Sequence, residues 1–180
     1  DCLLSRGLGD VYKRQVSELL KINKDIQVVI GKSKNILLDP IPNNFKLEEN
    51  SKKAIISATA AITCSGTATL ECAVEDTPMV VCYKLSTISW YIAKIVSKVN
   101  YSSIVNLILN KKAVPELLQN EMNSNNIVKE IMPLLDLKSF KRKKMLSDFN
   151  EIRKTLGVPG VYERSASLII SKTKSFNKPK

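Results

Sequence analysis

Short apolar runs that alternate with helix-like segments are the feature that most constrains this 180-residue chain. Three such runs are rich in apolar, often β-branched residues and are typical of buried strands: 25–31 (DIQVVIG), 61–64 (AITC) and 78–83 (PMVVCY). Between them we expect a helix over 51–59, capped by Asn50 or Ser51, and a second helix from Thr67 towards Asp76. This order favours parallel strands joined by crossover helices. The expected fold is therefore α/β, a Rossmann-like parallel sheet flanked by helices.

The second half of the chain is expected to be helical. Apolar residues recur at helical spacing in four stretches: 87–99, 125–135, 138–156 and 161–171. Gly157, Pro159 and Gly160 separate the last two of these helices. The stretch 35–44 contains two prolines and predicts a loop, and 177–180 predicts a frayed tail.

The positive charge is concentrated at the C-terminal end. Of the net charge of +11, the segment 137–180 carries +9, from 12 basic and 3 acidic residues. Such a face can meet phosphates, nucleic acid or an anionic membrane surface, although a solvated basic helix is the commoner explanation. The sequence has no aromatic-studded strand or zinc finger to support nucleic-acid binding.

Several chemistries are excluded by residue usage. The chain has no histidine, so it lacks the proton-relaying base of Ser-His-Asp and Cys-His catalysis. Its four cysteines show no Cys-x-x-Cys spacing, so with histidine also absent we expect neither a zinc site nor a redox motif. We also expect no other metal and no cofactor. The most apolar of the long windows, 54–74, is interrupted by polar residues and does not predict a transmembrane helix.

The most informative motif is 62–71, ITCSGTATLE. A strand leads to Ser65, Gly66 forms the turn, and Thr67 begins the next helix, which leaves backbone N–H groups and the positive end of a helix dipole available to an anion. A diphosphate would fit there, and Glu71 could accept hydrogen bonds from a ribose diol. The alternative is a simple helix cap in which Glu71 is a surface acid.

A second polar position is Asn106, which lies between Val105 and Leu107. An asparagine among apolar residues should be buried with its amide paired, so it either pins a loop or faces a ligand. The following polar residues are expected to be exposed: Lys111, Lys112, Glu116 and Gln119.

Three segments, in this order and spacing, resemble the C-terminal half of bacterial lipid-A-disaccharide synthase: SGTATLECAVEDTPMVVCYKLS, SWYIAKIVSKVNY and NLILNKKAVPELLQ. The resemblance implies the nucleotide-binding half of a two-domain GT-B glycosyltransferase. It implies an inverting hexosyltransferase that moves 2,3-diacylglucosamine from UDP to 2,3-diacylglucosamine 1-phosphate and releases UDP in lipid A biosynthesis. It also implies that Ser65, Gly66 and Thr67 hold the diphosphate, that Glu71 binds the ribose, and that Asn106 is functionally important.

The resemblance also sets the expected boundaries. Residues 1–15 are expected to be a non-native leader, and 16–176 a truncated UDP-sugar-binding C-terminal domain. Val105 and the pair Lys111-Lys112 depart from the residues usual in the family. The acceptor domain has no counterpart here, so we expect no catalytic residue in this chain and no activity from it alone. The implied partners are UDP-diacylglucosamine, a lipid acceptor, the anionic inner-membrane surface on its cytoplasmic side, and a second copy in a homodimer.

Two other interpretations stay open. One is a different UDP-sugar GT-B glycosyltransferase of the peptidoglycan type, which shares the glycine turn and the acidic ribose residue, although the segment NLILNKKAVPELLQ argues against it. The other is a non-catalytic basic module that binds nucleotides or other anions. Titration with UDP and with RNA would discriminate between an enzyme half and a nucleic-acid-binding module.

Overall fold

A computed structural model describes residues 17–31, 45–96, 99–158 and 160–176. Residues 17–22 are helical. The elements that follow are β1 (Val28–Gly31), β2 (Phe45–Glu48), α2 (Ser51–Ser57), β3 (Ala61–Cys64), α3 (Thr67–Val74), β4 (Met79–Tyr83), α4 (Thr87–Val96), α5 (Ile104–Leu109), β5 (Glu116–Leu118), the 3-10 helix η2 (Gln119–Glu121), α6 (Ser124–Leu135), α7 (Phe140–Leu156) and α8 (Val161–Phe176).

All the strand pairs are parallel, which confirms the expected α/β fold. β1 pairs with β2, and a second sheet has the order β3-β4-β5. Ala61 lies opposite Met79, and Val81 lies opposite Glu116. Because the strands are parallel, β3 and β4 end at the same edge, where Cys64 is paired with Cys82. Ligands of open α/β sheets bind at this carboxyl edge.

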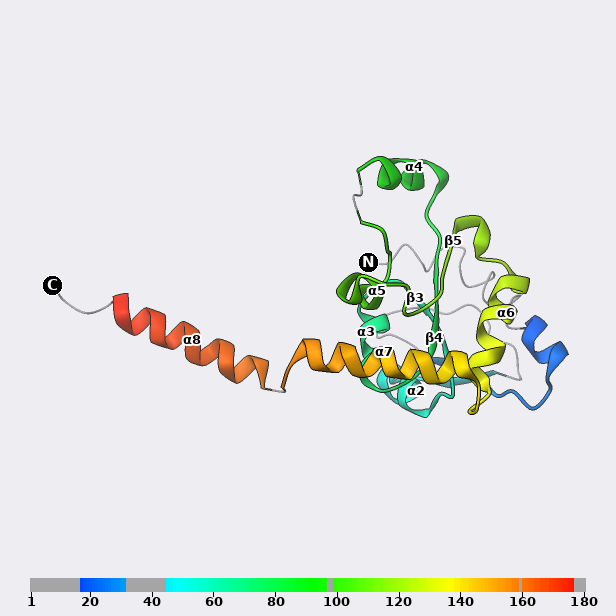
Figure 1. Cartoon of the computed structure of the whole chain (residues 1–180), viewed down its shortest axis with the longest axis horizontal. Helices are drawn as coiled ribbons and strands as arrows, with labels where there is room; N and C mark the ends of the chain where they lie inside the picture. Colours follow the sequence, from blue (N-terminus) through cyan, green and yellow to red (C-terminus); the bar gives the residue numbers. More distant parts are fainter. Residues whose placement is uncertain (1–16, 32–44, 97–98, 159, 177–180) are drawn as a thin grey trace.

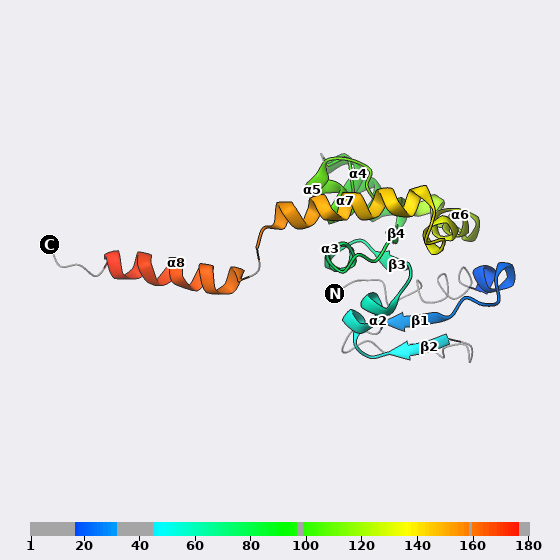
Figure 2. The same ribbon diagram turned by 60° about the horizontal axis from the view of Figure 1, so that its bottom comes forward.

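β4 is the centre of the core. Met79, Val80, Val81 and Cys82 have no exposed surface, as expected for a strand with a neighbouring strand on each side and with α3 and α6 packed against it. α7 packs against α3, α5 and α6 and contributes the fully buried Phe149. It lies across the sheet in Figure 1, and Figure 2 shows α7 and the β1–β2 pair on opposite sides of β3.

The expected helices are present with small shifts of their ends. Asn50 caps α2 as expected, since its side chain accepts hydrogen bonds from the N–H groups of Lys52 and Lys53. The helix expected over 87–99 is described as far as Val96, since 97–98 lie outside the described residues. The loop 35–44, the segment 1–15 and the tail 177–180 also lie outside the described residues.

The short elements β2, α5, β5 and η2, and the helix over 17–22, were not expected from the sequence. β2 and β5 have four and three residues, and α5 has six, so none is long enough to show a clear apolar period. α5 begins after Ser103, whose hydroxyl accepts the N–H of Asn106 at 3.2 Å. Pairing with β1 and β4 therefore defines β2 and β5, whereas α5 also has a local N-cap.

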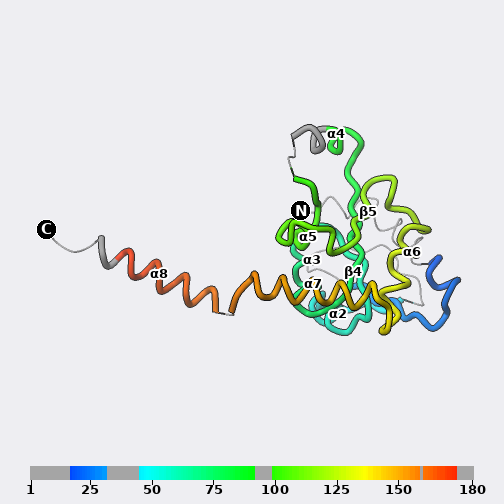
Figure 3. Tube along the Cα trace, viewed as in Figure 1, coloured from blue at the N-terminus to red at the C-terminus, as the bar shows by residue number. Residues whose placement is uncertain are grey.

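Two helices stand apart from the core. α4 projects beyond the carboxyl edge, and α8 extends away from the rest of the molecule with exposed side chains over 161–173 (Figures 1 and 3). In the described part of the chain, no helix is both long and apolar enough to cross a bilayer.

Candidate functional site

The turn between β3 and α3 has the geometry that the sequence predicts. Gly66 is the N-cap of α3, with φ of 142° and ψ of −163°, a conformation that favours glycine. No side chain caps this helix terminus, and a Cβ built at Gly66 would meet nothing within 4 Å. The space beside Gly66 is therefore open, and Thr67, the first residue of α3, is exposed. An anion at this position would lie at the positive end of the α3 dipole, next to its first N–H groups.

Ser65 fixes this turn to a distant segment. Its hydroxyl donates a hydrogen bond of 2.6 Å to the carbonyl oxygen of Ser102. A serine hydroxyl has one proton to donate, so in this structure the proton is used within the protein. Ser65 thus acts here as a tie between the turn and residue 102, and the backbone N–H groups are left as the donors for an anion.

Glu71 lies one helical turn beyond Thr67 and shares its face of α3. Both residues line a groove of about 450 Å³ between α2 and α3. The remaining lining residues come from the same two helices and the α3 C-cap: Lys52, Ile55, Leu70, Val74 and Glu75. The Lys52 ammonium lies 3.2 Å from the Glu75 carboxylate and joins the two sides. The exposed Glu71 carboxylate thus borders the same groove as the start of α3.

Asn106 is fully buried, and every hydrogen-bonding position of its amide is occupied. Oδ1 accepts the N–H groups of Ala113 and Val114 at 2.8 and 2.9 Å. Nδ2 donates to the Val114 carbonyl at 2.9 Å and to Glu116 Oε1 at 2.8 Å. In this structure Asn106 holds the 113–116 segment, and its amide has no position left for a ligand.

Glu116 was expected to be an exposed surface acid, and that expectation is wrong. Its half-buried carboxylate accepts the N–H groups of Ser102 and Ser103, both at 2.9 Å, in addition to Asn106 Nδ2. Gln119 is also half-buried, because its side chain bonds both the N–H and the carbonyl of Leu85. Their polar partners come from other segments, so the local sequence carried no signal for this burial.

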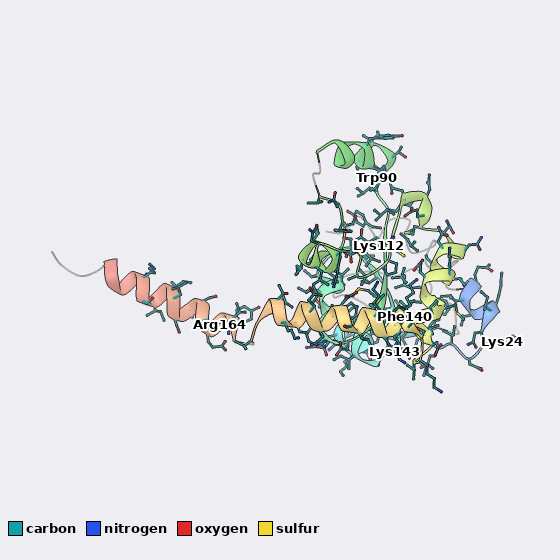
Figure 4. The ribbon with its side chains drawn as sticks, in the orientation of Figure 1. Lys24, Trp90, Lys112, Phe140, Lys143 and Arg164 are labelled. Carbon is teal, nitrogen blue, oxygen red and sulfur yellow. The ribbon has the colours of Figure 1, made fainter. Side chains whose placement is uncertain are left out.

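Of the two lysines in this stretch, Lys112 is exposed and labelled in Figure 4, whereas Lys111 is engaged by α7. The Lys111 ammonium lies 2.8 Å from Asp148 and 2.6 Å from Glu151. Hydrogen bonds to these two carboxylates raise the pKa of Lys111. These two ion pairs anchor the chain just after α5 to α7.

The buried thiols beside the site are not poised as nucleophiles. Burial, with a smaller contribution from the Glu71 charge, raises the pKa of Cys72 to about 12. Burial also raises the pKa of Cys82 to about 12, with a contribution from Cys64. A thiol is nucleophilic as its thiolate, so both groups stay protonated and inert near neutral pH.

Comparison with known proteins identifies the family. A family model described as lipid-A-disaccharide synthetase matches residues 9–168. The chain belongs to this family. The matched region of the lipid-A-disaccharide synthetase family begins within the 1–15 segment, and it contains the turn, the groove and the buried asparagine described above.

Individual relatives carry the same name. The chain is 34% identical over 171 residues to the lipid-A-disaccharide synthase of Synechocystis, covering 93% of this chain and 39% of the relative. It is 36% identical over 118 residues to that of Syntrophus aciditrophicus, covering 66% of this chain and 30% of the relative. It is 40% identical over 121 residues to that of Prochlorococcus marinus, covering 66% of this chain and 31% of the relative. The chain thus spans between 30% and 39% of the length of these three relatives.

Proposed function

We propose that this chain is the UDP-sugar-binding part of an inverting glycosyltransferase of the lipid-A-disaccharide synthase family. The reaction is transfer of 2,3-diacylglucosamine from UDP to 2,3-diacylglucosamine 1-phosphate, with release of UDP. The observation that carries the proposal is the uncapped Gly66 turn at the carboxyl edge of the sheet, beside a groove lined by Glu71. The family match supports the choice of reaction.

The turn would act on the diphosphate. When the sugar leaves UDP, negative charge develops on the diphosphate, and fixed N–H groups stabilise such charge without having to reorganise. The N–H groups at Thr67 and Ala68 lie at the positive end of the α3 dipole, where an anion is favoured. Gly66 leaves the approach to them open.

Glu71 would act on the ribose. Four residues along a helix correspond to a rise of about 6 Å, so Glu71 lies one turn beyond the N–H groups of the turn. A ribose joined to a diphosphate at the helix start can reach a carboxylate at that distance, and a ribose diol presents two O–H donors to it. The exposure of Glu71 leaves both carboxylate oxygens accessible.

We also propose that the protein acts at the cytoplasmic face of the inner membrane as a peripheral protein. Several basic side chains of 137–180 have partners within the protein: Lys141 pairs with Glu130, Arg153 pairs with Asp76, and Arg142 donates to two carbonyls. Lys138, Lys143, Lys144 and Lys154 are exposed on or beside α7, where Figure 4 labels Lys143. These lysines would provide the contact with anionic lipid.

A homodimer is part of the same proposal. α8 exposes apolar side chains along its length, including Leu168, Ile169 and Ile170 at 61%, 63% and 53%. A second copy of the chain would remove this apolar surface from water.

Calorimetric titration with UDP tests the nucleotide site. We expect UDP to bind and Glu71→Gln to weaken binding by about 1 to 3 kcal/mol, the range for a lost charge-assisted hydrogen bond. Simple Coulomb repulsion predicts the opposite sign, because removing a negative charge near a diphosphate should strengthen binding. The matched control is Glu49→Gln, which changes an exposed acid before α2 and should leave the affinity unchanged.

Two results would contradict the proposal. Failure of the unmodified chain to bind UDP would refute the nucleotide site as a whole. Equal affinities of the Glu71→Gln and Glu49→Gln variants would remove Glu71 from it. A parallel titration with RNA should give no saturable binding, and tight RNA binding without UDP binding would favour the basic-module interpretation.

A further inference from the structure

A single carboxylate gathers three N–H groups at the first residue of β5. Glu116 Oε2 accepts the N–H of Ser102, and Oε1 accepts the N–H of Ser103 and the Nδ2 of Asn106, at distances between 2.8 and 2.9 Å. We call these four residues the Glu116 clasp. A carboxylate offers acceptors only, so it is suited to hold several donors at one point. The clasp joins β5 to the start of α5.

The clasp continues directly to the Gly66 turn. The N–H of Ser102 is held by Glu116, and the carbonyl oxygen of the same residue accepts the hydroxyl of Ser65 at 2.6 Å. Ser102 therefore connects the carboxylate to the residue immediately before Gly66. α3 and α5 pack against each other, which brings the two ends of this connection together (Figure 1).

We infer that Glu116 is a positioning residue for nucleotide binding, which acts through Ser102 and Ser65 on the orientation of the Gly66 turn. The inference rests on the proposed UDP site. It also assigns Asn106 an indirect role, because the saturated amide orients Glu116 and the 113–116 segment rather than touching a ligand.

The reason lies in how N–H groups bind a diphosphate. Their contribution depends on distance and angle, so the turn must be held close to the binding geometry before the ligand arrives. No side chain caps α3. The turn is tied to another segment by the hydrogen bond from the Ser65 hydroxyl to the Ser102 carbonyl oxygen. Glu116 holds the segment that carries this acceptor through the N–H groups of Ser102 and Ser103.

The first test is Glu116→Gln, measured by UDP calorimetry on the whole chain. Glutamine keeps the shape but turns one acceptor into a donor, so at least one of the three N–H groups meets another donor. We expect UDP to bind about fivefold more weakly or worse, in a variant that a thermal melt shows to be folded. The matched control is Glu121→Gln, an exposed acid in η2 five residues further along, which should bind UDP like the unmodified chain.

A double-mutant cycle separates positioning from a purely structural role. If Glu116 acts through Ser65, the loss caused by Glu116→Gln should fall to about twofold or less in a Ser65→Ala background. A structural role that merely lowers stability would leave the affinity of the folded variants unchanged. Unchanged affinity in Glu116→Gln, or the same fold loss with and without Ser65, would overturn the inference.

Hydrogen exchange on the unmodified chain provides a second test that does not depend on a folded variant. UDP at ten times its dissociation constant should slow exchange of the Ser102 and Ser103 amides about tenfold, if their opening is coupled to that of the turn. Unchanged exchange at saturation would overturn the inference while the proposed function stands. Failure of the unmodified chain to bind UDP would overturn both.

Discussion

Asn106→Asp replaces a single NH2 group by oxygen and tests the buried network directly. The oxygen that accepts from Ala113 and Val114 is retained. The atom that donated to Glu116 Oε1 at 2.8 Å and to the Val114 carbonyl at 2.9 Å becomes an acceptor facing two acceptors. At neutral pH it would also place a second carboxylate against that of Glu116.

The magnitude follows from the cost of avoiding this pair. Two negative charges 2.8 Å apart repel by about 6 kcal/mol at an effective dielectric constant of about 20. The two carboxyl groups therefore reach a lower free energy when one of them keeps its proton. Keeping a proton costs about 1.4 kcal/mol for each pH unit above about 4, the ordinary value of a carboxyl group. At pH 7 the variant should therefore be about 4 kcal/mol less stable, a large part of the stability of an ordinary domain.

The sign of the pH dependence distinguishes this mechanism from simple loss of packing. The folded variant holds one more proton than the unfolded chain, so its stability falls as the pH rises from about 4 to 7. Urea denaturation at several pH values measures the difference from the unmodified chain. Asn120→Asp, an exposed control, should stay within about 0.5 kcal/mol. A deficit that does not grow with pH, or one as small as that of the control, would refute the reasoning.

Two further predictions concern alkaline stability and membrane binding. Burial raises the pKa of Cys72 and Cys82 from 9.0 to about 12. The folded protein therefore keeps these two protons in a pH range where the unfolded chain loses them, and the free energy of unfolding falls between pH 9 and pH 12. The fall is about 1.4 kcal/mol per thiol for each pH unit. Denaturation at pH 8 and pH 10 should show this fall in stability, and the fall should be smaller in the Cys72→Ala variant. An equal fall in the variant and in the unmodified chain would contradict the prediction. Co-sedimentation with liposomes should require anionic lipid. The bound fraction should fall as the salt concentration rises to about 0.5 M, because salt screens the charges of exposed lysines. Salt-independent binding would contradict a role for these lysines.

The sequence alone was sufficient for the elements whose signals are local. The strand 61–64 and the turn after it were predicted at their observed positions, because a run of apolar residues, a glycine and a helix start lie next to each other in the chain. The buried β4 and the long α7 were found for the same reason. Glu71 could also be placed on the face of Thr67, since helical spacing fixes which residues share a face.

The tertiary structure alone decided the polar interior beside this turn. Ser65 bonds a residue 37 positions away, and Glu116 collects N–H groups 13 and 14 positions before it. β5, with three residues, exists because β4 pairs with it. A charged residue in a short amphipathic stretch is usually solvated, and only the arrival of buried donors from other segments makes its burial favourable. That is why Glu116 resembled a surface acid in the sequence and is a half-buried acceptor in the fold.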